Sequence, residues 1–130
     1  MDLHWLSKAV VLAIHDEQLA EHGGASGLRD EGLLDAALAR PVNVVHYDWQ
    51  ANVGRLAAAY ALGLAKTHPF MDGNKRLSFT VTETLLLLNG HRLVADDAAC
   101  LHVWLAMASG ALGDEAFIDW LQANVEPVAA

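Results

Sequence analysis

Residues 68–76 gather most of the side chains in this chain that could perform chemistry together. The segment reads His-Pro-Phe-Met-Asp-Gly-Asn-Lys-Arg. It therefore combines an imidazole that exchanges protons near neutral pH with a carboxylate, an amide and two cations. A simple connection between two helices needs none of these groups. We therefore treat the segment as the candidate active site.

The two cations indicate an anionic ligand. The segment leads into a helix that carries Leu77, and the first amide groups of a helix have no acceptor within it, so they favour an anion. Lys75 and Arg76 oppose the helix dipole at this end, and a bound polyphosphate removes that conflict. Arg76 can hold two phosphate oxygens with its planar guanidinium group, while Lys75 supplies a compact charge.

His68 and Asp72 add the groups that phosphate chemistry needs. His68 can accept the proton of an incoming Ser, Thr or Tyr hydroxyl, which makes that hydroxyl a nucleophile towards phosphorus. Taken alone, however, His68 would be better explained as a structural histidine. Asp72 is a natural ligand for a Mg²⁺ ion that bridges phosphates. The same carboxylate could instead only cap the helix that follows.

Helices are expected on both sides of this segment. Ser7 can cap a first helix over residues 7–22, and Gly23-Gly24 ends it. Asp30 can cap a second helix, which we expect to stop at Pro41, because proline cannot continue a helix. Residues 42–50 lack a clear period and are expected to form a loop.

The most apolar helices flank the candidate site directly. Residues 51–67 are rich in alanine and are expected to form the central helix. The helix after the site ends near Gly90, the next is capped by Asp96 or Asp97, and the last covers residues 114–125. No strand pattern is evident. We therefore expect an all-α fold: a compact helical bundle of about six helices, with residues 1–130 as one domain.

Composition narrows the functional classes. The chain is 54% hydrophobic and carries a net charge of -8, the wrong sign for a protein that binds nucleic acid. No apolar stretch has the length of a membrane-spanning helix, and Cys100 is the only cysteine, so we expect a cytoplasmic protein. The other histidines and the four tryptophans show no metal-site spacing and are expected to have structural roles.

The segment resembles the motif of the Fic/Doc family, His-Pro-Phe-x-Asp/Glu-Gly-Asn-Gly/Lys-Arg, and in particular its Doc (death-on-curing) branch of toxins. Residues 27–34 and 37–41 are also similar to the N-terminal half of Doc-type proteins, so the resemblance covers essentially the whole chain. It implies a compact helical enzyme that uses ATP and Mg²⁺ to modify a protein hydroxyl. His68 would be the base, Asp72 the metal ligand, and Gly73, Asn74 and Arg76 the phosphate-binding residues.

Lys75 bears on which group is transferred. Family members that transfer AMP carry Gly at this position, whereas Doc-type members carry Lys and are understood to phosphorylate elongation factor Tu, which arrests translation. Lys75 therefore favours phosphoryl transfer, whereas Pro69 and Gly73 match the AMP-transferring pattern. A protein adenylyltransferase stays open, as does a catalytically silent binding module.

Regulation is expected to come from another protein. Many Fic proteins carry a self-inhibitory Ser/Thr-x-x-x-Glu-Gly/Asn motif, but here Ser26 and Glu31 are spaced one residue too far apart. The resemblance therefore implies an antitoxin that inhibits in trans.

Overall fold

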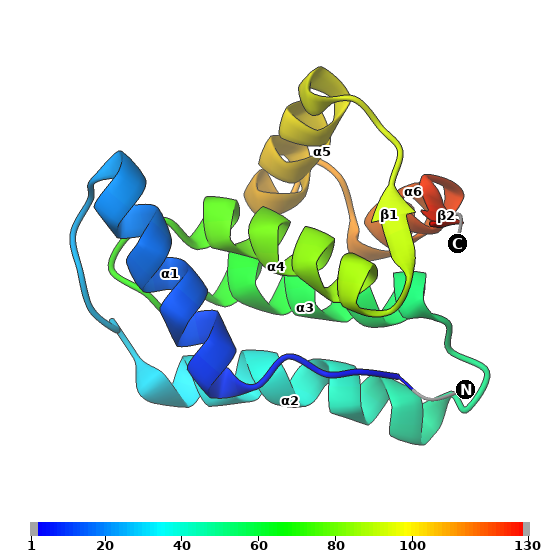
Figure 1. Cartoon of the computed structure of the whole chain (residues 1–130), viewed down its shortest axis with the longest axis horizontal. Coiled ribbons are helices and arrows are strands. Elements are labelled where there is room, and N and C mark those ends of the chain that lie inside the picture. The colour runs from blue at the N-terminus through cyan, green and yellow to red at the C-terminus, as the bar shows by residue number, and fades with distance from the viewer. Residues whose placement is uncertain (1–2, 129–130) are drawn as a thin grey trace.

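The computed structural model describes residues 3–128, which form six helices and two short strands (Figure 1). In chain order the elements are α1 (Lys8–His22), α2 (Glu31–Tyr47), α3 (Val53–Thr67), α4 (Asn74–Leu88), β1 (His91–Leu93), α5 (Asp97–Ser109), α6 (Asp114–Ala123) and β2 (Val125–Pro127). The expected all-α bundle is confirmed. No helix in the described part of the chain is long and apolar enough to cross a membrane.

The central helix is α3, as the sequence predicts. Every residue from Leu56 to Ala65 is buried, and α3 packs against α2, α4 and α6. Gly63 allows the closest approach, because a Cβ atom there would lie 3.1 Å from both the Cα and the carbonyl oxygen of Ala37 on α2. The position of α3 matters for function, since its last residue leads directly into the candidate site.

Three of the expected helix starts are confirmed by their capping contacts. The Ser7 hydroxyl accepts a hydrogen bond from the Val10 amide at 3.2 Å. The carboxylates of Asp30 and Asp96 each accept one from the amide three residues later, at 3.1 and 2.8 Å. These side chains satisfy amides that the helix itself leaves without an acceptor.

The expectation that the second helix stops at Pro41 is wrong. α2 continues through Pro41 to Tyr47, so most of the expected loop over residues 42–50 is helical. Proline removes one helical hydrogen bond, at a penalty of about 3 kcal/mol. Here Pro41 is buried and Val45, one turn later, packs against the core. Tertiary packing therefore keeps the helix going where the local preference is to end it.

The two strands were not expected. β1 and β2 pair antiparallel, with Arg92 opposite Glu126, and each has only three residues. Such short strands show no alternation that a sequence pattern could reveal. The last helix accordingly ends at Ala123 instead of Val125, because Val125 is the first residue of β2.

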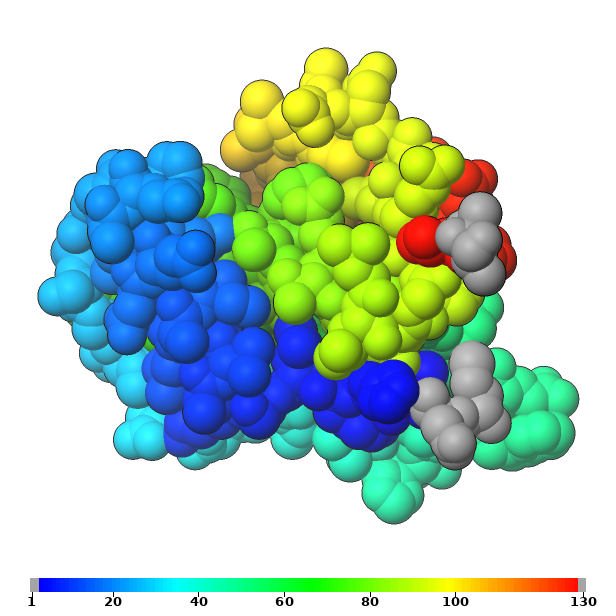
Figure 2. Space-filling view, in the orientation of Figure 1, coloured from blue at the N-terminus to red at the C-terminus, as the bar shows by residue number. Residues whose placement is uncertain are grey.

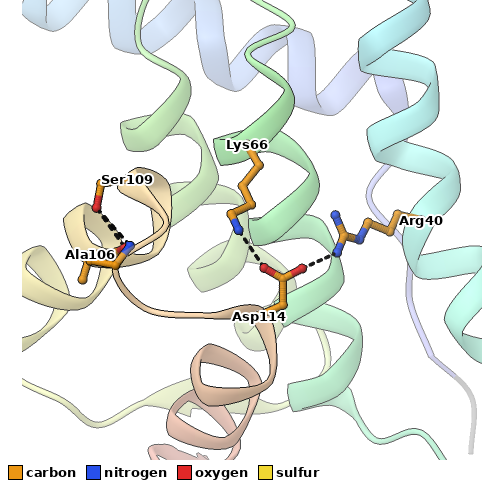
Figure 3. A network of polar contacts seen from close by, with 6 residues as sticks. Arg40, Lys66, Ala106, Ser109 and Asp114 are labelled. Atoms are coloured by element: carbon orange, nitrogen blue, oxygen red, sulfur yellow. Dashed lines mark hydrogen bonds and ion pairs between the residues drawn. The ribbon is translucent and has the colours of Figure 1, made fainter.

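A polar contact fixes α6 to the centre of the bundle. At the start of α6 the Asp114 carboxylate binds Lys66 of α3 at 2.8 Å and Arg40 of α2 at 3.2 Å (Figure 3). These hydrogen bonds hold the pKa of Asp114 below its ordinary value, and the bond from Lys66 has the larger effect. Lys66 is two residues before His68, so this contact also secures the end of α3 near the candidate site.

The remaining helices lie around this centre. α1 contacts α4, and Figure 2 shows α1 exposed at the surface (blue). α5 forms a separate projection at the top of the same face (yellow to orange). α5 contacts α3 and α4. Both α1 and α5 therefore pack against the helices that flank the loop between α3 and α4.

Candidate active site

His68 begins the loop between α3 and α4 in an unusual backbone conformation. It is the C-cap of α3, with φ 52° and ψ 59°, and the only non-glycine with positive φ among residues 3–128. This left-handed conformation is disfavoured for residues with a Cβ atom and persists only where neighbouring contacts impose it.

Arg29 provides such contacts. Its guanidinium group donates to the carbonyl oxygens of Thr67 at 2.8 Å and of His68 at 2.7 Å. These carbonyls lie at the end of α3, where the helix offers them no amide partner. Arg29 therefore holds in place the backbone that carries His68.

The next part of the loop is held through its main chain. The amides of Arg29 and Asp30 both donate to the Pro69 carbonyl, at 2.8 and 3.1 Å, and the Met71 amide donates to the Gly27 carbonyl at 3.1 Å. An isolated bridge between Leu28 and Phe70 lies between these contacts. The segment before α2 therefore fixes the main chain of the loop through hydrogen bonds.

Asn74 closes the loop from within. Its side chain is buried, accepts from the Phe70 amide and donates to the Phe70 carbonyl, both at 3.0 Å. Phe70 itself is buried in the hydrophobic core, so its ring anchors the loop. Since its amide group is already engaged, the part of Asn74 that is available to an anion is its backbone N–H.

α4 begins without a side-chain cap. Its N-cap is Gly73, in the left-handed conformation with φ 79°, so capping of this helix is not the role of Asp72. The Asp72 carboxylate instead accepts from the Gly73 amide at 2.8 Å. The first main-chain bond into the helix runs from the Leu77 amide to the Gly73 carbonyl at 2.9 Å. Within the described residues, the amides of Asn74, Lys75 and Arg76 have no acceptor.

A cavity of about 770 Å³ opens over this helix start. All six predicted site residues line it: His68, Asp72, Gly73, Asn74, Lys75 and Arg76. The structure thus brings the predicted base, carboxylate and cations to one cavity, which is lined by the same residues whose amides are free at the start of α4. Asp72 supplies an oxygen ligand of the kind that Mg²⁺ prefers. His68 and Lys75 also border a second, more open hollow, together with His102 and Ser109 of α5.

The opposite wall of the cavity comes from α5, which the motif did not reveal. It consists of Asp97, Cys100, Leu101, Trp104 and Leu105. Trp104 is buried and donates to the Ser78 hydroxyl at 3.0 Å, which connects this wall to α4. Burial raises the pKa of the Cys100 thiol, and Glu83, Asp97 and Asp96 raise it further. Cys100 is therefore a poor nucleophile at neutral pH.

α1 also reaches the loop, through a residue that sequence reasoning treated only as a surface or core histidine. His15 is buried, and its Nε2 lies 2.8 Å from the Asp72 carbonyl oxygen. One turn later, the Gln18 amide group lies beside Thr80 and the Arg76 carbonyl. A single histidine within a helix carries no spacing signal, so only the folded structure reveals this contact.

Residues 5–86 match the family described as the Fic/DOC family. The chain belongs to the Fic/DOC family. It is 44% identical to the Toxin Doc of Mycolicibacterium smegmatis over 75 residues, which are 57% of this chain and 58% of that protein. The match therefore spans less than two thirds of that relative. The chain is also 26% identical to the Protein kinase doc of Escherichia phage P1 over 117 residues, or 90% of this chain and 92% of that one.

The family match includes α3, the loop and most of α4. α5, which forms the opposite wall of the cavity, lies beyond it. The similarity to the Protein kinase doc covers 90% of the chain, and both relatives support the assignment of this chain to the Doc type.

Proposed function

We propose that this chain transfers the γ-phosphoryl group of ATP to a hydroxyl of a target protein. The observation that carries this proposal is the meeting of His68, Asp72, Lys75 and Arg76 with the free amides of α4 at one cavity. A polyphosphate suits this arrangement, because amides at a helix start and two cations all favour negative charge.

In the proposed reaction His68 takes the proton of the acceptor hydroxyl. The acceptor oxygen forms a bond to the γ-phosphorus while the bond from that phosphorus to the bridging oxygen breaks, and ADP leaves. Arg76 and the amides of Asn74 and Lys75 hold the phosphates in place. Asp72 would hold Mg²⁺, which when bound offsets charge on the phosphate oxygens.

Lys75 supports phosphoryl transfer over AMP transfer. It borders both the main cavity and the second hollow, as His68 also does. A glycine there would leave this space empty and uncharged. The phosphorus that faces His68 is the one transferred, so a side chain that changes how the nucleotide lies changes the product.

AMP transfer is the second candidate, and Pro69 and Gly73 favour it. Gly73 has φ 79°, a conformation that suits glycine, so its presence is also explained by the backbone alone. Pro69 contributes a carbonyl that accepts two hydrogen bonds, which any residue could supply. These two residues therefore discriminate less between the reactions than Lys75 does.

The partners follow from the same proposal. We expect the target to be a translation factor such as elongation factor Tu, and inhibition to come from an antitoxin protein. Met71, Leu101 and Leu105 are 56%, 63% and 48% exposed and line the cavity. An amphipathic helix of the antitoxin could cover these apolar side chains and block access to His68.

Isotope labelling tests the proposed reaction. The purified chain is incubated with Mg²⁺, a bacterial lysate and ATP labelled on either the α- or the γ-phosphate. We expect label on the target only from γ-labelled ATP, and less of it with Lys75→Gly. Label from the α-phosphate would establish AMP transfer instead, and no label from either nucleotide would favour a silent binding module.

A further inference from the structure

His15 makes two contacts with the catalytic loop from the middle of α1. Its side chain is only 2% exposed. Its ring stacks on Phe70, with 3.8 Å between ring centroids and 21° between planes. Its Nε2 lies 2.8 Å from the Asp72 carbonyl oxygen. One side chain therefore contacts the loop both before and after Met71.

The hydrogen bond fixes the tautomer of this histidine. A carbonyl oxygen can only accept, so Nε2 of His15 must carry the hydrogen. Phe70 lies against the ring face, and a Cβ atom on Gly73 would lie only 3.7 Å from Nε2. The ring is thus confined between the loop anchor and the residue that precedes α4.

His15 binds the carbonyl of Asp72, the residue directly before the N-cap of α4. With Gly73 as its N-cap, α4 leaves the Arg76 amide free, as any helix does with its first amides. If α4 began one residue earlier, with Gly73 in the helical conformation, the Asp72 carbonyl would accept from the Arg76 amide. That bond is not formed in the described structure, where the first bond into α4 is from Leu77 to Gly73. His15 occupies the Asp72 carbonyl, and the Arg76 amide is left free.

We infer that His15 is a positioning residue that sets where α4 begins and so keeps the Arg76 amide available to an anion. Only the identity of that anion, the ATP polyphosphate, rests on the proposed function. Gln18 supports the same end of the site from the next turn of α1, through Thr80 and the Arg76 carbonyl. α1 thereby acts on the anion site without contributing a group to it.

Two substitutions separate this role from simple packing. His15→Phe keeps a ring that can stack on Phe70 but has no donor for the Asp72 carbonyl. His15→Gln keeps an amide donor near the position of Nε2 but loses the ring. If His15 only fills space, the Phe variant should resemble the wild type more closely. If the hydrogen bond matters, the Gln variant should.

Amide hydrogen exchange measured by NMR on the nucleotide-free protein is the primary test. In His15→Phe we expect Gly73 to join α4, so that the Arg76 amide bonds to the released Asp72 carbonyl and exchanges more slowly, by roughly tenfold. In His15→Gln it should exchange as in the wild type. Loss of stability can only speed exchange, so slower exchange cannot result from a damaged fold. Val11→Ala, at a buried position one turn earlier on α1, is the matched control.

ATP affinity in the presence of Mg²⁺ is the second readout. We expect it to fall roughly three- to tenfold in His15→Phe and to recover in His15→Gln. If the Arg76 amide exchanges at the same rate in the wild type and in both His15 variants, the inference is overturned. If the Phe variant does not fold, the wild type still decides, because ¹⁵N spectra that show no hydrogen on Nε2 of His15 would overturn the inference as well. A wild type that binds no ATP would refute the proposed function, while the exchange comparison would still decide the role of His15.

Discussion

His68 illustrates how one residue of the site depends on its surroundings. Its backbone is left-handed, and its carbonyl is bound by Arg29 at 2.7 Å. A conformation of this kind typically raises the energy by about 1–3 kcal/mol and is retained at sites where geometry matters. The orientation of the proposed base is therefore set by the main chain and by Arg29, before any substrate arrives.

The first prediction concerns this base. His68→Ala should lower the rate of transfer by about 100- to 10,000-fold, since a general base typically contributes that much. Nucleotide affinity should stay nearly unchanged, because His68 acts on the acceptor hydroxyl. Transfer is measured with labelled ATP, and affinity by calorimetry. Full activity in this variant would refute the assignment of His68.

The second prediction concerns Asp72. Asp72→Asn keeps an oxygen that can accept from the Gly73 amide, so the loop should persist, but it removes the charge that Mg²⁺ prefers. We expect Mg²⁺-dependent nucleotide binding to weaken by about tenfold, comparable with the loss of other groups that support metal sites. Asp119→Asn, at an exposed position of α6 away from the cavity, serves as control. An unchanged magnesium titration would leave Asp72 with only its contact to Gly73.

For single residues, the sequence predicts which side chains could take part in the reaction, but not which residues keep them in position. The ordered segment from His68 to Arg76 was recognisable because its groups are adjacent in the chain. Arg29 and His15 act through hydrogen bonds to backbone carbonyls 39 and 57 residues away. Such contacts depend on where the chain folds back, and no local pattern records them.

Among the elements, the pair α2 and α3 shows how close packing overrides local preference. Pro41 cannot donate to the carbonyl of Ala37, and a Cβ atom on Gly63 would lie only 3.1 Å from that same carbonyl oxygen. The two helices therefore approach closely at the point where α2 lacks one of its own hydrogen bonds. The capping residues predicted the helix starts, whereas burial decided where α2 ends.

The third prediction tests this close approach. Gly63→Ala adds a Cβ atom 3.1 Å from the backbone of Ala37, so the two helices must separate slightly. Overpacking typically lowers the free energy of unfolding by about 1–3 kcal/mol, which exceeds the gain of up to about 1 kcal/mol from replacing a helical glycine. We expect net destabilisation in urea denaturation. Gly113→Ala adds the same atom where it meets nothing within 4 Å, so its effect should be smaller and should reflect only the poorer capping of α6 by alanine.

The fourth prediction concerns the contact of α6 with α2 and α3. The hydrogen bonds from Lys66 and Arg40 lower the pKa of Asp114, so their stabilisation is present above the ordinary carboxyl pKa of 3.8 and is lost as the pH falls through the lowered value. The carboxylate is 42% exposed, so we expect Asp114→Asn to lower stability by only about 1 kcal/mol at neutral pH.

Denaturant titrations at a series of pH values measure this effect. The stability difference between wild type and Asp114→Asn should shrink towards zero in acid. A difference that stays constant down to about pH 3 would show that the carboxylate charge is not its source. Asp119→Asn again provides a control, because Asp119 forms no ion pair within the described residues.

For the whole molecule, charge is distributed unevenly. The chain carries a net charge of -8, yet Lys75 and Arg76 lie together at the cavity. Negative charge is therefore favoured locally at the cavity, while the overall field favours a basic partner surface. The sequence predicts this uneven charge directly, because the charged residues can be counted without knowing the fold. The apolar wall that α5 adds to the cavity became evident only when the helices were assembled.

The last prediction concerns the chain in a cell. If His68 transfers phosphate to a translation factor and the inhibitor is a separate protein, the chain expressed alone should arrest growth. Incorporation of labelled methionine should fall within minutes of induction, before the culture stops growing, because translation would be the process first affected. His68→Ala, produced at the same level, should leave both unchanged, since it removes the base while the cavity wall stays in place. Normal translation with abundant, folded wild-type protein would contradict the toxin interpretation, even if the chain binds ATP in vitro.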